Sequence, residues 1–440
     1  MNSPPSTPWI ERFRPLLNPT VIAERASLMP NPLIGVREMS PEQAKLAIEA
    51  EFKRIYYPSS QCVDVLLTWI THAHAHCQAM YPTSLRHIEG VYSPDSPLPE
   101  YSTPQCLHGM AGVGKSATLS AFTRLMPKVT TVTSSDGTVF PLESHRVVTL
   151  GNCSSTRDLL LQLTRHQGPG SSKRLEQLLR KQAFRDGVSF LCLDEFQFVS
   201  QSPTANSRVT QMLLSIYFIG LPWAFIANDS LVRKLKNRNN EDKHRLLKNH
   251  VELKPELPDS KDWVTQIEWW KRVAPDIFVF DAASDAEAIH QLTGGVNRAA
   301  THLLSVAATT AIRSQSNVDL SALKAAYNSR DYATFREEVE DSMSLDTRTR
   351  NRLTSPLQQA TVVDAQEHFE RKRQQATDEN ALLASLTPSE RTAYKKIQAK
   401  NGPKQQAPAK VKTLKRSKEP AGTDRARSLL DNLDWLNDNL

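Results

Sequence analysis

The segment HGMAGVGKSATLS, His108–Ser120, is the most informative stretch of the sequence. It matches the pattern G-x-x-x-x-G-K-[ST], in which Gly109 comes first and Gly114, Lys115 and Ser116 close the motif. Glycines let such a loop curl so that its backbone N–H groups face phosphates. The lysine reaches the β- and γ-phosphates, and the hydroxyl ligates Mg²⁺. We call residues 109–116 the phosphate loop and expect it to bind ATP with Mg²⁺.

Two further residues belong to the predicted ATP contacts. Gly112 adds backbone freedom inside the loop, and Ala117 lies in the first turn of the helix that should follow it. The positive end of that helix would point at the anion. The predicted nucleotide-binding residues of this segment are therefore Gly109, Gly112, Gly114, Lys115, Ser116 and Ala117.

A second segment carries the acidic groups that such a loop requires. VSFLCLDEF, Val188–Phe196, is an apolar strand that ends in Asp194 and Glu195. We predict that Asp194 holds Mg²⁺ together with Ser116 and that Glu195 polarises the attacking water. Two acids at a strand end could instead form a solvated turn, but their combination with the phosphate loop favours an ATPase site.

The fold class follows from an alternation of short apolar strands with helices. Strand patterns occur around residues 105–108, 146–151, 188–194 and 222–228, which predicts an α/β core with a parallel sheet flanked by helices over residues 105–255. VTTVTSSDGTVF, 129–140, predicts a hairpin that turns at Asp136–Gly137. Residues 256–335 show helical patterns only, which predicts an all-α lid.

The flanking regions differ from this core in composition. Seven prolines precede residue 33, so residues 1–39 are expected to form an extended strap. Residues 40–104 should contain a helix that opens with a capping signal at Ser40 and runs to about Met80, and then a Pro-rich linker. Residues 336–440 are charged and then of low complexity, which predicts a disordered tail.

The positive charge of the chain belongs to this tail. Residues 391–427 contain twelve Lys and Arg residues against Glu419 and Asp424, a net of +10, whereas the whole chain carries +7. Three aspartates follow in the last thirteen residues, so residues 1–390 are close to neutral. Overall basicity therefore does not indicate nucleic-acid binding by the globular part.

Other composition features exclude some classes of protein. The five cysteines are scattered without a C-x-x-C motif, which favours reduced thiols in a cytosol-like compartment. Neither a signal peptide nor an apolar run long enough for a bilayer is recognised, so we expect no membrane association. In HAHAHCQ, only His72 and His76 would share a helix face, so a metal site is not expected there.

Three more polar residues are candidates for catalysis. Asn228, at the end of LPWAFIAND, could orient the attacking water or be an ordinary strand-end residue. Arg245 could reach the γ-phosphate of a neighbouring subunit, although Arg233, Arg238 and Lys243 compete for this role. Arg298, in TGGVNRAATHLL, could sense the γ-phosphate of its own subunit or lie on a helix surface.

These motifs occur in an order that resembles the AAA+ ATPase family, and in detail the transposition regulators of the TnsC/TniB type. Three segments between residues 30 and 310 carry the finer likeness: NPLIGVREMSP (Asn31–Pro41), VVTLGNCSSTRDLLLQL (Val147–Leu163), and LDEFQFVSQ with MLLSIYFIGLPWAFIAND (193–229). The chain departs from the pattern at Asn228, where many of these regulators have threonine, and in the placement of the loop glycines.

The resemblance implies an ATP-dependent ring or helical homo-oligomer on double-stranded DNA that couples a target-selector protein to a transposase and its nuclease. It also implies a bacterial, cytoplasmic, nucleoid-associated location. DNA phosphates would be contacted by Thr156, Arg157, Lys173 and Arg174, which are otherwise solvated residues of a charged helix and loop. Two alternatives stay open: a AAA+ replication initiator or helicase loader, and a signalling or defence NTPase that does not act on DNA.

The C-terminus carries its own signal. In RARSLLDNLDWLNDNL, 425–440, Leu429, Leu433, Leu436 and Leu440 recur at helical spacing and would form one apolar stripe. This segment could fold back on the lid. We favour a tethered helix that binds the transposase or its associated nuclease, with the basic tract as a flexible leash near DNA.

Overall fold

The structure is a computed structural model. It describes residues 7–29, 31–133, 137–150, 153–166, 168, 170–194 and 205–341. Glu195, the basic tract and the C-terminal segment 425–440 lie outside the described residues, so the predictions made for them stay predictions.

The centre of the fold is a five-stranded parallel sheet in the order β4-β5-β6-β1-β7. Its strands are β1 (Gln105–His108), β4 (His145–Thr149), β5 (Phe190–Asp194), β6 (Trp223–Ile226) and β7 (Asn249–Glu252). The three inner strands are buried along almost their whole length, as expected for a parallel sheet covered on both faces. The predicted α/β class is confirmed.

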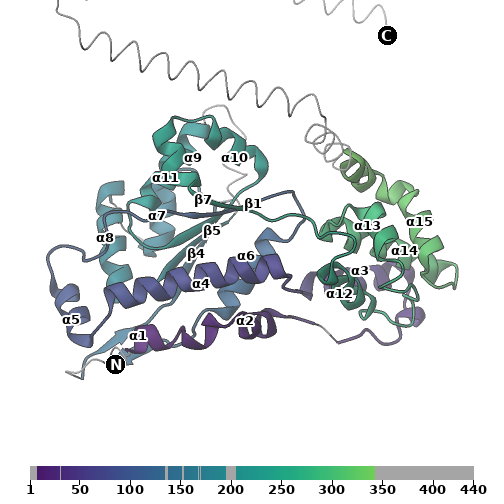
Figure 1. Cartoon of the computed structure of the whole chain (residues 1–440), viewed down its shortest axis with the longest axis horizontal. Helices are drawn as coiled ribbons and strands as arrows, with labels where there is room; N and C mark the ends of the chain where they lie inside the picture. The colour runs from purple at the N-terminus through teal and green to yellow at the C-terminus, as the bar shows by residue number, and fades with distance from the viewer. Residues whose placement is uncertain are drawn as a thin grey trace, which may run out of the picture. The chain divides into compact units, whose positions relative to one another are not determined.

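Helices cover both faces of this sheet (Figure 1). In that view α4 and α6 run below the sheet and α9, α10 and α11 lie above it. The helices around the sheet are α4 (Ser60–Met80), α5 (Ser84–Tyr92), α6 (Lys115–Leu125), α7 (Thr156–Thr164), α8 (Ser172–Arg185), α9 (Ala205–Tyr217), α10 (Asp229–Lys236) and α11 (Asn240–Leu247). Trp69 of α4 packs edge-on against Phe122 of α6, with ring centroids 5.3 Å apart, which joins these two helices.

The predicted hairpin is confirmed as a separate two-stranded antiparallel sheet. It consists of β2 (Thr131–Thr133) and β3 (Val139–Pro141), and Thr133 pairs with Val139. Gly137 has a φ of 84°, which is the left-handed conformation expected near such a turn.

The expectation of an extended strap is corrected for residues 8–26. This segment forms α1 (Pro8–Glu11) and α2 (Pro19–Ala26), each with a proline at its first turn. A proline is favourable at that position because the first N–H groups of a helix have no intrahelical partner. Trp9 and Phe13 are fully buried in the core around the sheet, so the N-terminal segment is packed and not a loose strap.

The expected helix from Ser40 to Met80 is instead two helices, α3 (Pro41–Arg54) and α4. The capping box of Ser40 and Gln43 at the start of α3 is present as predicted. The break falls at residues 55–59, where Pro58 restricts the preceding residue to extended backbone. Tyr56 uses this extended stretch for two backbone hydrogen bonds with Leu28, each 2.9 Å long.

The lid is helical, as predicted, and consists of α12 (Lys261–Lys271), α13 (Ala286–Thr293), α14 (Asn297–Arg313) and α15 (Leu320–Tyr327). It shares one hydrophobic core with α3, whose Ala44, Ile48 and Phe52 are buried there. The second core surrounds the sheet and includes α4. We call these the lid core and the sheet core. Among the described helices, none is long and apolar enough to cross a membrane.

Candidate nucleotide-binding site

The phosphate loop connects β1 to α6 and has the backbone geometry that its glycines allow. Gly109 and Gly112 have φ angles of 142° and 87°, which side-chain-bearing residues rarely adopt. A Cβ atom at Gly109 would stand 2.3 Å from the carbonyl oxygen of Leu253, and one at Gly112 would stand 2.8 Å from the Cβ of Arg298. The loop is therefore held against the end of β7 and the start of α14, and both positions require glycine.

Lys115 begins α6 and folds back into the loop. Its Nζ donates to the carbonyl oxygens of Gly109, at 2.7 Å, and Met110, at 2.6 Å. Burial lowers the pKa of this lysine, while the carboxylates of Asp229 and Asp194 oppose the shift. The ammonium group thus lies inside the curled loop, close to two acids.

Ser116 and Asp194 are brought together as predicted from the sequence. The hydroxyl of Ser116, in the first turn of α6, donates to Oδ1 of Asp194 at the end of β5 over 3.4 Å. Hydroxyl and carboxylate oxygens are the ligands that Mg²⁺ prefers. These two residues fit a magnesium ion at the mouth of the loop, whereas the neighbouring candidate Glu195 lies outside the described residues.

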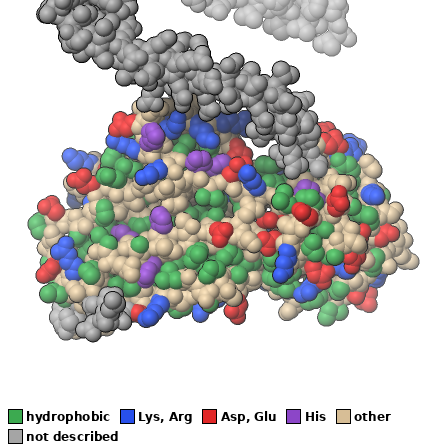
Figure 2. Space-filling model, viewed as in Figure 1, with side chains coloured by type: hydrophobic (Ala, Val, Ile, Leu, Met, Phe, Trp, Pro, Cys, Tyr) green, Lys and Arg blue, Asp and Glu red, His purple; other side chains and the backbone are tan. Residues whose placement is uncertain are grey.

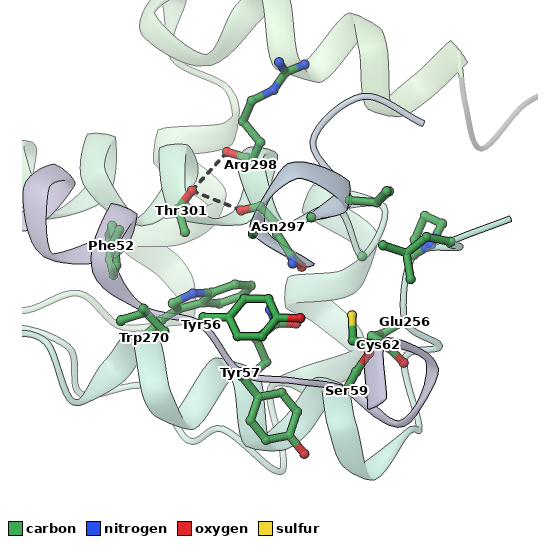
Figure 3. Close-up of a pocket in the computed structure, with 18 of the residues that line it drawn as sticks. Phe52, Tyr56, Tyr57, Ser59, Cys62, Glu256, Trp270, Asn297, Arg298 and Thr301 are labelled. Carbon is green, nitrogen blue, oxygen red and sulfur yellow. Dashed lines mark hydrogen bonds between the residues drawn. The ribbon is translucent and has the colours of Figure 1, made fainter. Parts of the chain in front are cut away.

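A cavity of about 430 Å³ opens directly beside the loop (Figure 3). Its wall includes Gly114 and Ala117 of the phosphate loop and α6. The remaining wall comes from the end of α3, the break at residues 55–59, the segment after β7, and the lid helices α12 and α14. The cavity therefore lies between the sheet core and the lid core, next to the predicted phosphate site.

Sequence reasoning missed most of this cavity wall. Phe52, Tyr56 and Trp270 contribute aromatic surface, and Asn297 lies with its amide nitrogen 3.5 Å from where a Cβ of Gly114 would stand. The sequence offers one weak signal, the pair Tyr56–Tyr57 directly before Pro58, where aromatic residues occur in a helix break. The other wall residues are far apart in sequence and only the packing joins them.

The role predicted for Asn228 stays a prediction, whereas its neighbour Asp229 contacts the strand before the phosphate loop. Asn228 is the N-cap residue of α10, and its side chain makes no capping hydrogen bond. Asp229 pairs with Nδ1 of His108 at 2.8 Å, and His108 is the last residue of β1 before the phosphate loop. Asp229 was not among the sequence candidates, and the structure adds it because its carboxylate also acts on Lys115.

Arg298 lies against the loop through its backbone. Its N–H donates to the carbonyl oxygen of Gly112 over 3.2 Å. The guanidinium extends away from Tyr56 and Trp270 (Figure 3), and its Nη2 is 3.6 Å from Oε2 of Glu338. Its predicted contact with a γ-phosphate therefore requires the side chain to leave Glu338, and this role stays a prediction.

Arg245 lies near the N-terminal ends of the parallel strands, whereas the phosphate loop of the same chain lies at their C-terminal ends. It is near the end of α11, and β7 starts directly afterwards and runs parallel to β1. The loop follows the C-terminal end of β1. A residue just before β7 therefore lies at the opposite end of the two strands. Its guanidinium pairs with Glu241 and lies 5.9 Å from the ring centroids of Tyr217 and Phe218.

The competing basic residues occur on the same part of the molecule. Lys and Arg side chains gather over α10 and α11 at the top of the view in Figure 2. Arg233 is exposed on α10, and Arg238 pairs with Asp242 at 3.2 Å. The geometry thus agrees with a role for Arg245 in a neighbouring subunit, but this role stays a prediction.

The four candidate DNA contacts form one surface. Thr156 and Arg157 are in the first turn of α7, and Lys173 and Arg174 are in the first turn of α8. Nε of Arg157 donates to the carbonyl oxygen of Gly170 over 3.1 Å, which brings the two helix starts together. The three basic side chains are exposed.

Comparison with known proteins finds distant structural similarity and no match of sequence. No protein-family model and no curated protein matches the chain. Among solved structures, Cdc6p from Pyrobaculum aerophilum is similar over 53% of this chain and 62% of that chain, with 14% identity and a TM-score of 0.35. The ORC1 protein of Aeropyrum pernix, solved in complex with DNA, is similar over 57% and 64%, with 18% identity and a TM-score of 0.36.

The ORC2 protein of Aeropyrum pernix, solved with ADPNP and ADP, is similar over 58% of this chain and 66% of that chain, with 13% identity and a TM-score of 0.37. The match spans less than two thirds of the length of each of these three proteins. The chain is thus only distantly similar in structure to these three proteins. Likeness at this level carries no argument about function, which rests on the site itself.

Proposed function

We propose that this chain is a AAA+ ATPase that binds ATP and Mg²⁺ at the phosphate loop and hydrolyses ATP. The observation that carries the proposal is the pair formed by Ser116 and Asp194 next to the buried Lys115, in a loop whose Gly114 lines a cavity of about 430 Å³. A nucleoside fits the cavity while its phosphates reach the loop. Mg²⁺ held there would neutralise charge that develops on the phosphates during transfer.

Different residues of the chain would bind the phosphates, hold the metal and orient water. Lys115 and the loop N–H groups would bind the phosphates, and Ser116 with Asp194 would hold the metal. Asn228, Asp229 and Glu195 are the polar groups proposed to orient or polarise water. Arg298 would report the γ-phosphate to the lid, because its backbone already contacts Gly112.

The test of this proposal is ATP binding by a Lys115→Ala variant. We expect the variant to lose measurable ATP affinity, whereas Lys128→Ala, which changes an exposed lysine beyond α6, should bind like the unaltered protein. A folded Lys115→Ala protein with normal ATP affinity would overturn the site assignment.

We further propose that the ATPase oligomerises on double-stranded DNA and links a target selector to a transposase. The sequence likeness to TnsC/TniB-type regulators supports this role, together with Arg245, which lies at the strand ends away from its own loop, and with the basic surface at the starts of α7 and α8. Residues 425–440 would recruit the transposase or its nuclease.

Deletion of residues 425–440 tests the last step. ATP hydrolysis and DNA-dependent assembly should be retained, and co-purification with a transposase that binds the full-length protein should be lost. If the truncated protein fails to fold or to bind ATP, the segment has a structural role and the recruitment proposal is wrong.

A further inference from the structure

Gln266 is a buried polar side chain in the wall of the cavity. It lies on the inner face of α12, one turn before Trp270, and both residues line the cavity. Gln266 is only 7% exposed, and within the described part of the chain its carboxamide has no hydrogen-bond partner. The carboxamide is not among the fully enclosed polar atoms that lack a partner, so its oxygen and nitrogen are open to the cavity that it lines. A polar group that opens into a cavity is available to a bound molecule.

Other polar groups of the same wall already have partners. The hydroxyl of Tyr57 donates to Asp262 at 2.7 Å, and the hydroxyl of Thr301 donates to the carbonyl oxygen of Asn297 at 3.0 Å. Oε1 of Glu256 accepts from Gln61 at 3.0 Å. The carboxamide of Gln266 thus remains free to meet a ligand.

The surroundings of Gln266 suit a flat aromatic ligand. Phe52, Tyr56 and Trp270 line the cavity, and their rings lie near one another in Figure 3. Gly114 of the loop and Ala117 of α6 line the same cavity. A nucleoside triphosphate with its phosphates on the loop would therefore place its base among these rings. Aromatic faces pack on a base without distinguishing one purine from another.

We propose that Gln266 selects adenine by pairing with its edge. A carboxamide presents one acceptor and one donor side by side, and adenine presents its 6-amino donor beside a ring-nitrogen acceptor. The Gln266 oxygen would accept from the amino group, and its NH₂ would donate to the ring nitrogen. This inference rests on the proposed function, since it requires a nucleotide in the cavity.

The experiment compares ATP with purine riboside triphosphate, which is ATP without the 6-amino group. The unaltered protein should bind ATP about tenfold more tightly, the size expected for one buried hydrogen bond. Gln266→Leu, which keeps the volume, should weaken ATP binding and bring the ratio of the two affinities close to one. Gln266→Glu keeps the acceptor but loses the donor, so it should retain part of the preference.

The control is Gln291→Leu, which changes an exposed glutamine of the lid on α13 and should leave the ratio unchanged. If Gln266→Leu and Gln266→Glu both bind ATP with an unchanged ratio, the role of Gln266 is wrong while the ATPase proposal stands. If neither nucleotide binds the unaltered protein, the proposed function itself fails. Thermal unfolding of each variant shows that the comparison is made on folded protein.

Discussion

Ser116 and Asp194 show how two single residues can define a chemical site. Each is an ordinary residue of its element, one in the first turn of α6 and one at the end of β5. Their oxygen atoms come within 3.4 Å because parallel strands of one sheet end at the same edge. A hard cation at this point would be held by these side chains and by the phosphates of the nucleotide.

At this scale we predict the effect of Asp194→Asn. The amide removes one negative charge from the proposed metal site, so ATP affinity in the presence of Mg²⁺ should fall about tenfold or more. ATP affinity in EDTA should stay unchanged, because the loop contacts are intact. Titration calorimetry with and without Mg²⁺ measures both values.

The control for this variant is Asp259→Asn, at an exposed aspartate before α12. It should show the Mg²⁺ dependence of the unaltered protein. Equal Mg²⁺ dependence in Asp194→Asn would remove Asp194 from the metal site.

At the scale of elements, the starts of α7 and α8 form one surface. Ser155 and Ser171 cap the two helices, and Arg157, Lys173 and Arg174 are exposed in their first turns. Backbone N–H groups and cations at helix starts contact phosphates without reading bases. The surface therefore suits sequence-independent binding of a duplex.

We predict that Lys173→Ala combined with Arg174→Ala weakens DNA binding to a similar extent for any sequence. If each residue contacts one phosphate, the slope of log affinity against log salt concentration should fall in magnitude by about 2. Fluorescence anisotropy on duplex DNA across a salt series measures this slope.

Lys181→Ala is the matched control, because this exposed lysine belongs to the later turns of α8. It should keep the slope of the unaltered protein. An unchanged slope in the double variant would place DNA elsewhere on the molecule.

At the scale of the whole molecule, the phosphate loop and Arg245 lie at opposite ends of the parallel strands. Arg245 of one subunit therefore lies away from the phosphate loop of that subunit. A second copy of the chain can supply this arginine, with its α11 edge against the cavity of the first. Before a second copy binds, the guanidinium of Arg245 would stay in contact with Tyr217, Phe218 and Glu241.

We predict that Arg245→Ala loses DNA-stimulated ATP hydrolysis but retains ATP binding. Mixed with Lys115→Ala subunits, it should regain part of the turnover, because some interfaces then combine an intact loop with an intact arginine. Steady-state phosphate release from the mixture measures this recovery.

The competing arginine provides the control. Arg233→Ala should hydrolyse ATP like the unaltered protein. A mixture of Arg245→Ala and Lys115→Ala that co-assembles but shows no recovery would argue against a shared site.

Features that depend only on neighbouring residues could be predicted before the structure was known. The G-x-x-x-x-G-K-[ST] pattern, the apolar strand ending in Asp194, the capping box at Ser40 and the hairpin of β2 and β3 are local, so residue type and spacing were enough. Residue type and spacing did not show whether the prolines before residue 33 start helices or lie in an extended chain. Proline both restricts extended chains and starts helices, and only burial of Trp9 and Phe13 favoured the helices.

The assignment of α3 and α4 to the lid core and the sheet core depends on packing over the whole fold. α3 packs in the lid core and α4 in the sheet core, although they follow one another directly, and the break between them lines the cavity. Gln266 and Tyr56 meet there although more than two hundred residues separate them. Such neighbours are selected by the burial of apolar surface over the whole fold, which no local spacing encodes.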